Sequence, residues 1–194
     1  MSLASNVASV FLTSDPIPRA RLDRIDFYFG RLHIDAQGLR TVGSAIRRGR
    51  IQVRVGNTGP LLGAAYSSHH NRMTVPSARA HTTTLGQAAI LHEGVHALLD
   101  LTRFQTTALT DETAAYLAEA IYLRAASTMP VSRNPDTMRI YRTAFQLINQ
   151  HLLANRRGVR LRAADYQPLL DAIHNHQAYR GISPSQPNTG LGVP

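Results

Sequence analysis

Apolar residues recur along the first half of the chain with two different spacings, and each spacing predicts a kind of secondary structure. Apolar residues three or four positions apart predict short helices over residues 19–30 and 39–49. Residues 51–55 alternate between apolar and polar, which is typical of a half-buried strand, and further short strands are predicted at residues 62–67 and 72–75. We therefore expect two helices followed by a small sheet of about three strands.

The next segment, residues 85–101, is apolar nearly all round, and this predicts a buried central helix. Thr84, with Gln87 three residues later, fits a capping box at its start. Gly94 in the middle of the helix costs about 1 kcal/mol relative to alanine, so either close packing or room beside a site explains it.

The rest of the chain has helical spacing only. We predict a loop over residues 102–109, then a helix with Thr110 or Asp111 as its N-cap and a stop at Met129-Pro130. Helices over residues 137–154 and 163–179, separated near Gly158, follow. A small sheet followed by a run of helices is typical of the α+β class.

Length and composition indicate one folded domain. A chain of 194 residues with 43% hydrophobic and 17% charged residues can bury a single core. We assign residues 1–182 to a mainly helical α+β domain. Residues 183–194 are rich in turn-forming residues, and we predict that they form a disordered tail.

The sequence shows no segment for secretion or membrane insertion. Residues 1–18 lack a positively charged start, and their apolar run is too short for a secretory signal. No later stretch approaches the roughly 20 apolar residues of a membrane span. We therefore expect a protein that is made soluble in the cytoplasm, and export by a signal-independent route stays open.

The chain is strongly basic, with a net charge of +9, and all 21 of its basic side chains are arginines. A basic surface attracts acidic partners, including nucleic acid. The arginines are spread along the chain, and their mild concentration between Arg19 and Arg54 is interleaved with aspartates. This pattern is more typical of a solvated surface than of a phosphate-binding groove, so nucleic-acid binding is the alternative hypothesis.

The sequence HEGVH in the central helix carries the chemistry. His92 and His96 are four residues apart, so both imidazoles point the same way from a helix and can bind one divalent ion. A catalytic zinc takes three protein ligands and keeps one position for water, and Glu93 can take a proton from that water as general base. This is the physical content of the His-Glu-x-x-His pattern. Because the chain has no cysteine, histidines and carboxylates are its only strong metal ligands.

A third ligand is needed, and the rarity of glutamate narrows the choice. The chain has only three glutamates, and the two outside the motif, Glu112 and Glu119, both lie on the next predicted helix. Two apolar helices joined by a short loop pack together, which brings the start of the second beside the first. Glu112 is therefore the preferred ligand. Glu119 is the alternative, or else orients a ligating histidine or pairs with Arg124, and Asp100 is another candidate for the orienting role.

HEGVH followed by DETAAYLAEA resembles the glutamate zincins, which combine His-Glu-x-x-His with a later Glu-x-x-Ala helix. It is most similar to the ImmA/IrrE-like and bacterial effector-type metallopeptidases, which have a short connection between the two helices. The resemblance implies a zincin-like fold, zinc bound by His92, His96 and Glu112, and Glu93 as general base. It also implies hydrolysis of a peptide bond in a protein substrate, and the effector-type members suggest a role as a bacterial toxin or effector. Tyr116 departs from the larger glutamate zincins, which often have an aspartate there that supports a histidine.

A peptidase of this class binds its substrate as an extended chain along an exposed sheet edge, and residues 72–75 are the candidate strand. The donor to the developing oxyanion stays open among five residues: Tyr66, His81, His174, His176 and Tyr179. His69-His70 is predicted to be a solvated turn, because adjacent side chains on a strand point to opposite faces. A zinc-binding protein without catalysis is the other alternative, and the sequence does not indicate an oligomeric state.

Overall fold

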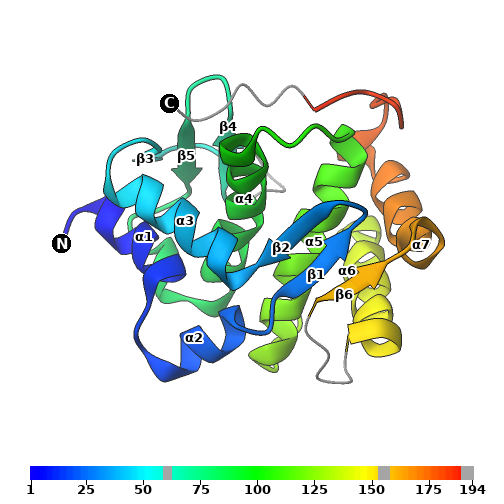
Figure 1. Ribbon diagram of the computed structural model, residues 1–194, viewed down its shortest axis with the longest axis horizontal. Coiled ribbons are helices and arrows are strands. Elements are labelled where there is room, and N and C mark those ends of the chain that lie inside the picture. Colours follow the sequence, from blue (N-terminus) through cyan, green and yellow to red (C-terminus); the bar gives the residue numbers. More distant parts are fainter. Residues whose placement is uncertain (59–62, 153–157, 189–194) are drawn as a thin grey trace.

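A computed structural model describes residues 1–58, 63–152 and 158–188 (Figure 1). Its helices are α1 (Leu3–Leu12), α2 (Pro16–Leu22), α3 (Ala36–Arg47), α4 (Thr84–Thr102), α5 (Ala108–Ala125), α6 (Pro135–Leu147) and α7 (Ala163–His174), with short turns η1 (Ala80–Thr82), η2 (Ile148–Leu152) and η3 (Gln177–Tyr179). Its strands are β1 (Asp26–Phe29), β2 (Leu32–Asp35), β3 (Gln52–Val55), β4 (Ala65–Ser67), β5 (Arg72–Val75) and β6 (Val159–Leu161). The predicted α+β class is confirmed. Predictions for residues 59–62, 153–157 and 189–194 lie outside the described residues.

The strands form two small sheets, each with one parallel and one antiparallel pair. The first has the order β2-β1-β6, and the second has the order β3-β5-β4, which is the sheet predicted ahead of the central helix. Strand β5 pairs with β3 on one side and with β4 on the other. The prediction that residues 72–75 form an exposed edge is therefore wrong, because neighbours already pair with both sides of that strand. The two edge strands of this sheet are β3 and β4.

The predicted helix over residues 19–30 is also wrong. Helix α2 ends at Leu22, and residues 26–29 form strand β1, whose residues alternate between half-buried and buried. Leu22, Ile25 and Phe29 are all buried, so the apolar positions themselves were correct. Their spacing fits a helix, but the pairing of β1 with β2 and with the distant β6 decides for a strand.

Further elements differ from the sequence prediction. Helix α1 and strands β2 and β6 were not predicted, and the last helix ends at His174, before the expected Tyr179. The N-cap of α4 is Thr83, whose side chain accepts a hydrogen bond from the Gly86 amide, so the capping box at Thr84 is wrong.

Helix α4 lies at the centre of the fold, with α1 and α3 on one side and α5 on the other (Figure 1). Gly94 faces the fully buried ring of Phe11 from α1, and a β-carbon at this position would lie 2.5 Å from Phe11 Cε1. Close packing, rather than room beside a site, therefore explains the glycine in the motif.

Replacing Gly94 by valine is expected to lower the free energy of unfolding by about 1–3 kcal/mol, because the new methyl groups overlap the Phe11 ring in a packed core. Urea denaturation measures the change. The control is Leu85→Val in the same helix, where the side chain is 50% exposed and a change below about 0.5 kcal/mol is expected. Equal stability of the Gly94 variant and the wild type would contradict this packing account.

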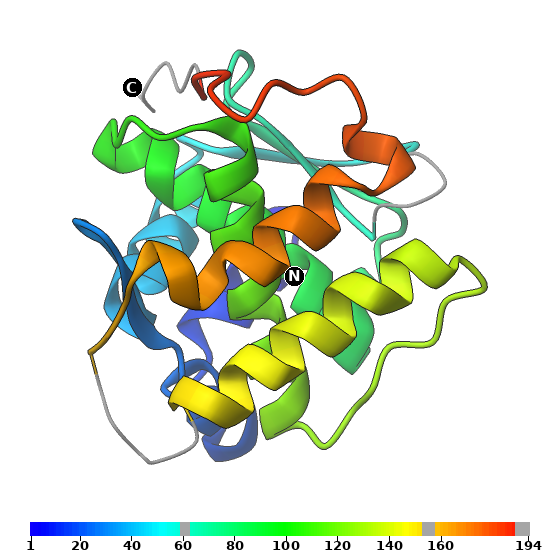
Figure 2. The ribbon, with the colours of Figure 1, turned by 90° about the vertical axis from the view of Figure 1, so that its right-hand side faces the viewer.

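Helices α6 and α7 cross over α5 on the side away from α1 and α3 (Figure 2). After η3 the chain runs over the top of the fold to the loop between α4 and α5 (Figure 1). There the Ala108 amide donates to Gln186 O at 2.9 Å, and the Asn188 amide donates to Thr106 O at 2.7 Å. Part of the predicted disordered tail, residues 183–188, thus lies beside the start of α5.

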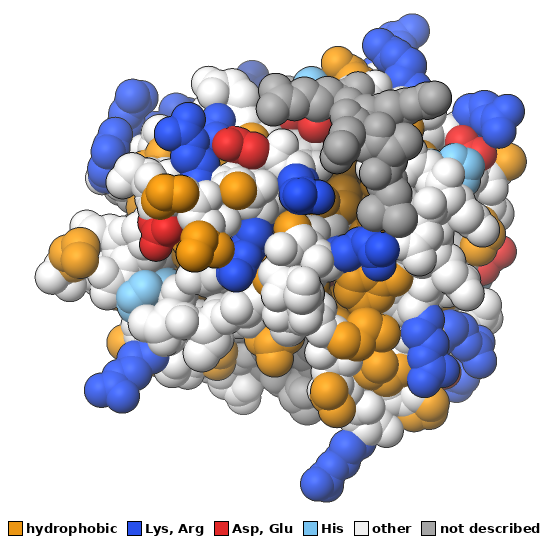
Figure 3. All heavy atoms as spheres, turned by 90° about the horizontal axis from the view of Figure 1, so that it is seen from below, with side chains coloured by type: hydrophobic (Ala, Val, Ile, Leu, Met, Phe, Trp, Pro, Cys, Tyr) orange, Lys and Arg blue, Asp and Glu red, His pale blue; other side chains and the backbone are white. Residues whose placement is uncertain are grey.

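The face of the molecule in Figure 3 carries separate arginine side chains, which lie among apolar, uncharged and a few acidic ones. Within the described ranges, no helix combines the length and apolarity required to cross a membrane.

Candidate metal centre

Three side chains from two helices converge on one point. His92 and His96 project from α4, and Glu112 projects from α5. The Nε2 atoms of His92 and His96 lie 3.4 Å and 3.7 Å from the Glu112 carboxylate oxygens. Ligands about 2.0–2.1 Å from a tetrahedral zinc lie about 3.4 Å from one another, so these separations match a shared ion. Among the described residues this is the group that can hold a metal, with all three ligand atoms within 4.8 Å of one another.

The connection between α4 and α5 sets this geometry. Arg103 has the left-handed conformation (φ 53°) that ends α4, and its amide donates to Asp100 O. Thr107 then caps α5 through a hydrogen bond from the Thr110 amide to its side chain. Because α5 begins at Ala108, Glu112 lies in its second turn and faces the motif. The short turn therefore places the carboxylate opposite the two imidazoles.

A buried carboxylate holds the far nitrogen of each histidine. His92 Nδ1 lies 3.0 Å from Glu119 Oε2, and His96 Nδ1 lies 2.8 Å from Asp111 Oδ1. Carboxylates accept these bonds, so Nδ1 carries the proton in each ring and Nε2 is left to face Glu112. Of the predicted roles for Glu119, the structure has the one that orients a histidine. Sequence reasoning missed Asp111, which it considered only as a helix cap.

Tyrosine hydroxyls support the acidic groups. Tyr179 donates to Glu112 Oε2 at 2.9 Å, and Tyr141 donates to Glu119 Oε1 at 2.8 Å. Burial, followed by neighbouring charges, raises the pKa of both hydroxyls, which therefore keep their protons and act as donors. The Tyr116 ring packs against the His92 ring in a T-shaped contact, with centroids 4.6 Å apart. It therefore covers His92 with an aromatic ring at the position where the larger glutamate zincins often have an aspartate.

Burial and the neighbouring charges shift the pKa of the histidines and of Glu112 in opposite directions. Burial lowers the pKa of His96, but Asp111 and Glu112 outweigh it and raise the pKa to about 9. Burial raises the pKa of Glu112, and the two histidines outweigh it and lower the pKa to about 2. In the metal-free protein both imidazoles therefore bind a proton more readily than a free histidine, and a bound cation would compete with that proton for Nε2.

Glu93 lies in the same cavity and is 5% exposed. Its Oε2 accepts a hydrogen bond of 2.7 Å from the main-chain amide of Tyr66 on the edge strand β4. Burial raises its pKa, and the nearby His96 and His92 act in the opposite direction. The motif glutamate is therefore fixed beside the metal-binding group without belonging to it.

The cavity has a volume of about 450 Å³, and its lining includes His92, Glu93, His96 and Glu112. Of the five candidate oxyanion donors, Tyr66, His176 and Tyr179 line it. The Tyr66 hydroxyl donates to Asp100 Oδ2 at 2.7 Å.

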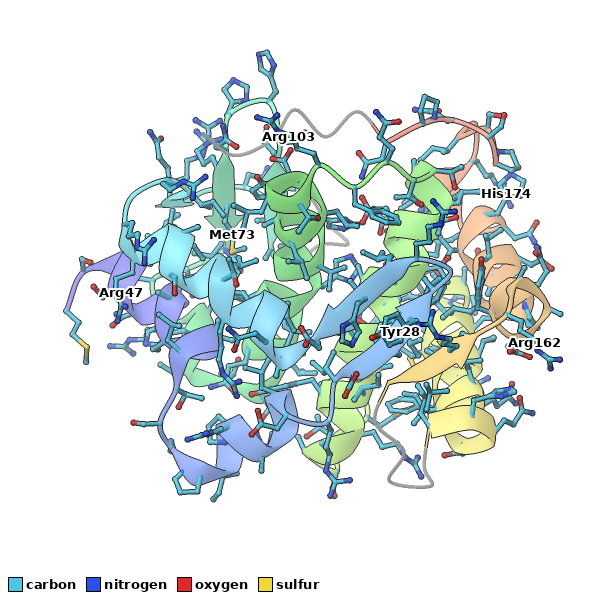
Figure 4. All side chains as sticks on the ribbon, viewed as in Figure 1. Tyr28, Arg47, Met73, Arg103, Arg162 and His174 are labelled. Carbon is cyan, nitrogen blue, oxygen red and sulfur yellow. The ribbon has the colours of Figure 1, made fainter. Side chains whose placement is uncertain are left out.

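The other candidate histidines lie elsewhere. The His81 ring bonds to Ala78 O, and His174 lies at the end of α7 on the outside of the fold (Figure 4). His69 and His70 are exposed in the turn between β4 and β5, as predicted.

Comparison with models of known protein families, with curated proteins and with solved structures finds no match to this chain.

Proposed function

We propose that the protein is a zinc-dependent peptidase that cleaves a protein substrate with Glu93 as general base. The observation that carries this proposal is the convergence of His92, His96 and Glu112, whose ligand atoms lie within 4.8 Å of one another inside a cavity that also contains Glu93. Two imidazoles and one carboxylate are a ligand set that suits catalytic zinc, and the described group offers three ligands where closed structural sites usually have four. Bound zinc would activate water and polarise the substrate carbonyl.

The chain's own groups would handle the proton. Glu93 Oε2 is held by the Tyr66 amide, and among the described residues no hydrogen bond to Oε1 is found. Oε1 would take the proton from the attacking water and deliver it to the leaving amine. Because the site is buried, this carboxylate has a raised pKa and is a stronger base than an exposed one.

Tyr179 is the donor that we favour for the developing oxyanion. Its hydroxyl keeps its proton and lies 2.9 Å from Glu112, a member of the converging group, whereas the Tyr66 hydroxyl bonds to Asp100, which is outside that group. A preorganised donor in a site that excludes water stabilises negative charge more strongly than one in solvent. His176 lines the cavity but is 3.0 Å from the Thr137 hydroxyl, which ties it to α6.

The substrate would lie along β4 as an extended chain. This strand is an edge of its sheet, and Ala65 and Tyr66 line the cavity. The Tyr66 amide donates to Glu93, so a substrate paired with β4 would lie next to the motif. A toxin or effector role would follow from the identity of the cleaved protein.

Incubation of the zinc-loaded protein with a mixture of denatured proteins, followed by identification of new amino termini, tests the proposal. We expect new termini with wild-type protein and none with the Glu93→Gln variant. Termini that form equally in both samples would reject Glu93 as the base. Binding of nucleic acid that depends steeply on salt and not at all on metal would favour the alternative function.

A further inference from the structure

Each metal-facing histidine stands at the end of a chain of three side chains. On one side Tyr141 of α6 donates to Glu119, which holds His92. On the other side Asn188 donates through Nδ2 to Asp111 Oδ2, while Asp111 Oδ1 holds His96. The second chain ends in a segment that neither the motif nor the peptidase mechanism uses.

Asn188 belongs to a segment that we call the C-terminal strap, residues 183–188. The strap crosses the start of α5 in the antiparallel direction, with a bridge between Pro187 and Thr107. Main-chain hydrogen bonds hold it at two points, from Ala108 to Gln186 and from Asn188 to Thr106. The Asn188 side chain turns inward and lines the cavity, while Gln186 is exposed.

The contact matters because Asp111 is a buried carboxylate with 5% exposure. A buried carboxylate requires partners for both oxygens, and an oxygen without one costs about 1–3 kcal/mol or draws in water. With Asn188 in place, one oxygen is satisfied from the strap and the other is directed at His96. Without it, Asp111 would be free to turn, and the His96 ring would lose its fixed direction toward Glu112.

We propose that Asn188 is a positioning residue of the metal centre, which sets the His96 ring through Asp111 and so makes the C-terminal strap part of the zinc site. This inference rests on the zinc site of the proposed function. Asn188 does not contact the ligand atoms, so its effect is on how well the site is organised.

Zinc affinity, measured by competition with a fluorescent chelator, tests the inference without any activity assay. Asn188→Ala is expected to weaken zinc binding by about 3- to 10-fold, less than the 10- to 100-fold typical of a residue that touches a ligand directly. The main-chain bond from Asn188 to Thr106 persists in this variant, so the melting temperature of the metal-free protein should change little. Gln186→Ala, in the same strap but exposed, is the matched control and should bind zinc like the wild type.

A double-mutant cycle identifies the route of the effect. If Asn188 acts through Asp111, Asn188→Ala should add no further loss in the Asp111→Asn background. It should add its full effect in the Tyr141→Phe background, which alters the other histidine.

Wild-type affinity in Asn188→Ala, or an equal loss with and without the Asp111 carboxylate, would overturn the inference and leave the proposed function standing. An equal loss in Gln186→Ala would assign the effect to the strap's stability and would also overturn it. A wild-type protein that binds no zinc would overturn both, and the first titration would show this.

Discussion

Replacing Glu93 by glutamine is expected to lower the rate of peptide hydrolysis by about 10²–10⁴-fold, the contribution typical of a general base. Glutamine has nearly the same shape, and its amide oxygen can still accept the 2.7 Å hydrogen bond from the Tyr66 amide. It cannot accept the proton of the attacking water, however. The loss should therefore appear in kcat, with little change in KM.

Zinc content distinguishes catalysis from a structural metal in this experiment. Glu93 is not one of the three converging side chains, so the variant should bind zinc in the same stoichiometry as the wild type. Asp171→Asn, a carboxylate-to-amide change on the exposed face of α7, is the control and should keep full activity. Full hydrolysis by the Glu93 variant would rule out its role, and absence of hydrolysis in both proteins with zinc bound would favour the non-catalytic alternative.

Replacing Glu112 by glutamine is expected to weaken zinc binding by more than about 100-fold, beyond the range of an outer partner. The substitution removes the only negative charge among the three converging groups, and a neutral amide is a poor zinc ligand. The fold should survive, because the amide oxygen can still accept the 2.9 Å bond from Tyr179.

Glu119→Gln is the matched comparison, because Glu119 contacts His92 through its outer nitrogen and lies outside the converging group. We expect a loss of about 10- to 100-fold in this variant. Titration of both proteins against a chelator of known affinity gives the ranking. A larger loss in Glu119→Gln than in Glu112→Gln would reverse the assignment of the third ligand.

The converging ligands could be predicted from sequence because their geometry is local. His92 and His96 share a helix face through their spacing alone, and the short loop after α4 restricts where Glu112 can lie. The choice of Glu112 over Glu119 followed from its nearness to that loop. These contacts need no knowledge of how distant parts of the chain pack.

Apart from Glu119, the outer partners were not predicted, and most of them depend on distant contacts. Tyr179 reaches Glu112 across 67 residues and Asn188 reaches Asp111 across 77, and neither has a spacing that marks it. Asp111 itself carried a signal that was not used. It directly precedes the proposed ligand, where a carboxylate on the same turn can reach the second histidine.

Strand order failed for a similar reason. The alternating pattern of residues 72–75 indicates a strand but does not indicate which strands pair with it. Strand β5 is central because β3, which precedes β4 in the chain, pairs with its other side in parallel. Residues 26–29 have apolar spacing that suits a helix or a strand, and the pairing with β2 and with β6, more than a hundred residues away, decides between them.

X-ray absorption at the zinc edge, on protein purified without chelator, tests the central claim most directly. We predict one zinc per chain with four nitrogen or oxygen ligands at about 2.0–2.1 Å, two of them imidazoles. A ligand shell without imidazole scattering, or a protein that retains no stoichiometric zinc when zinc is supplied, would contradict the claim that His92, His96 and Glu112 form a catalytic metal site.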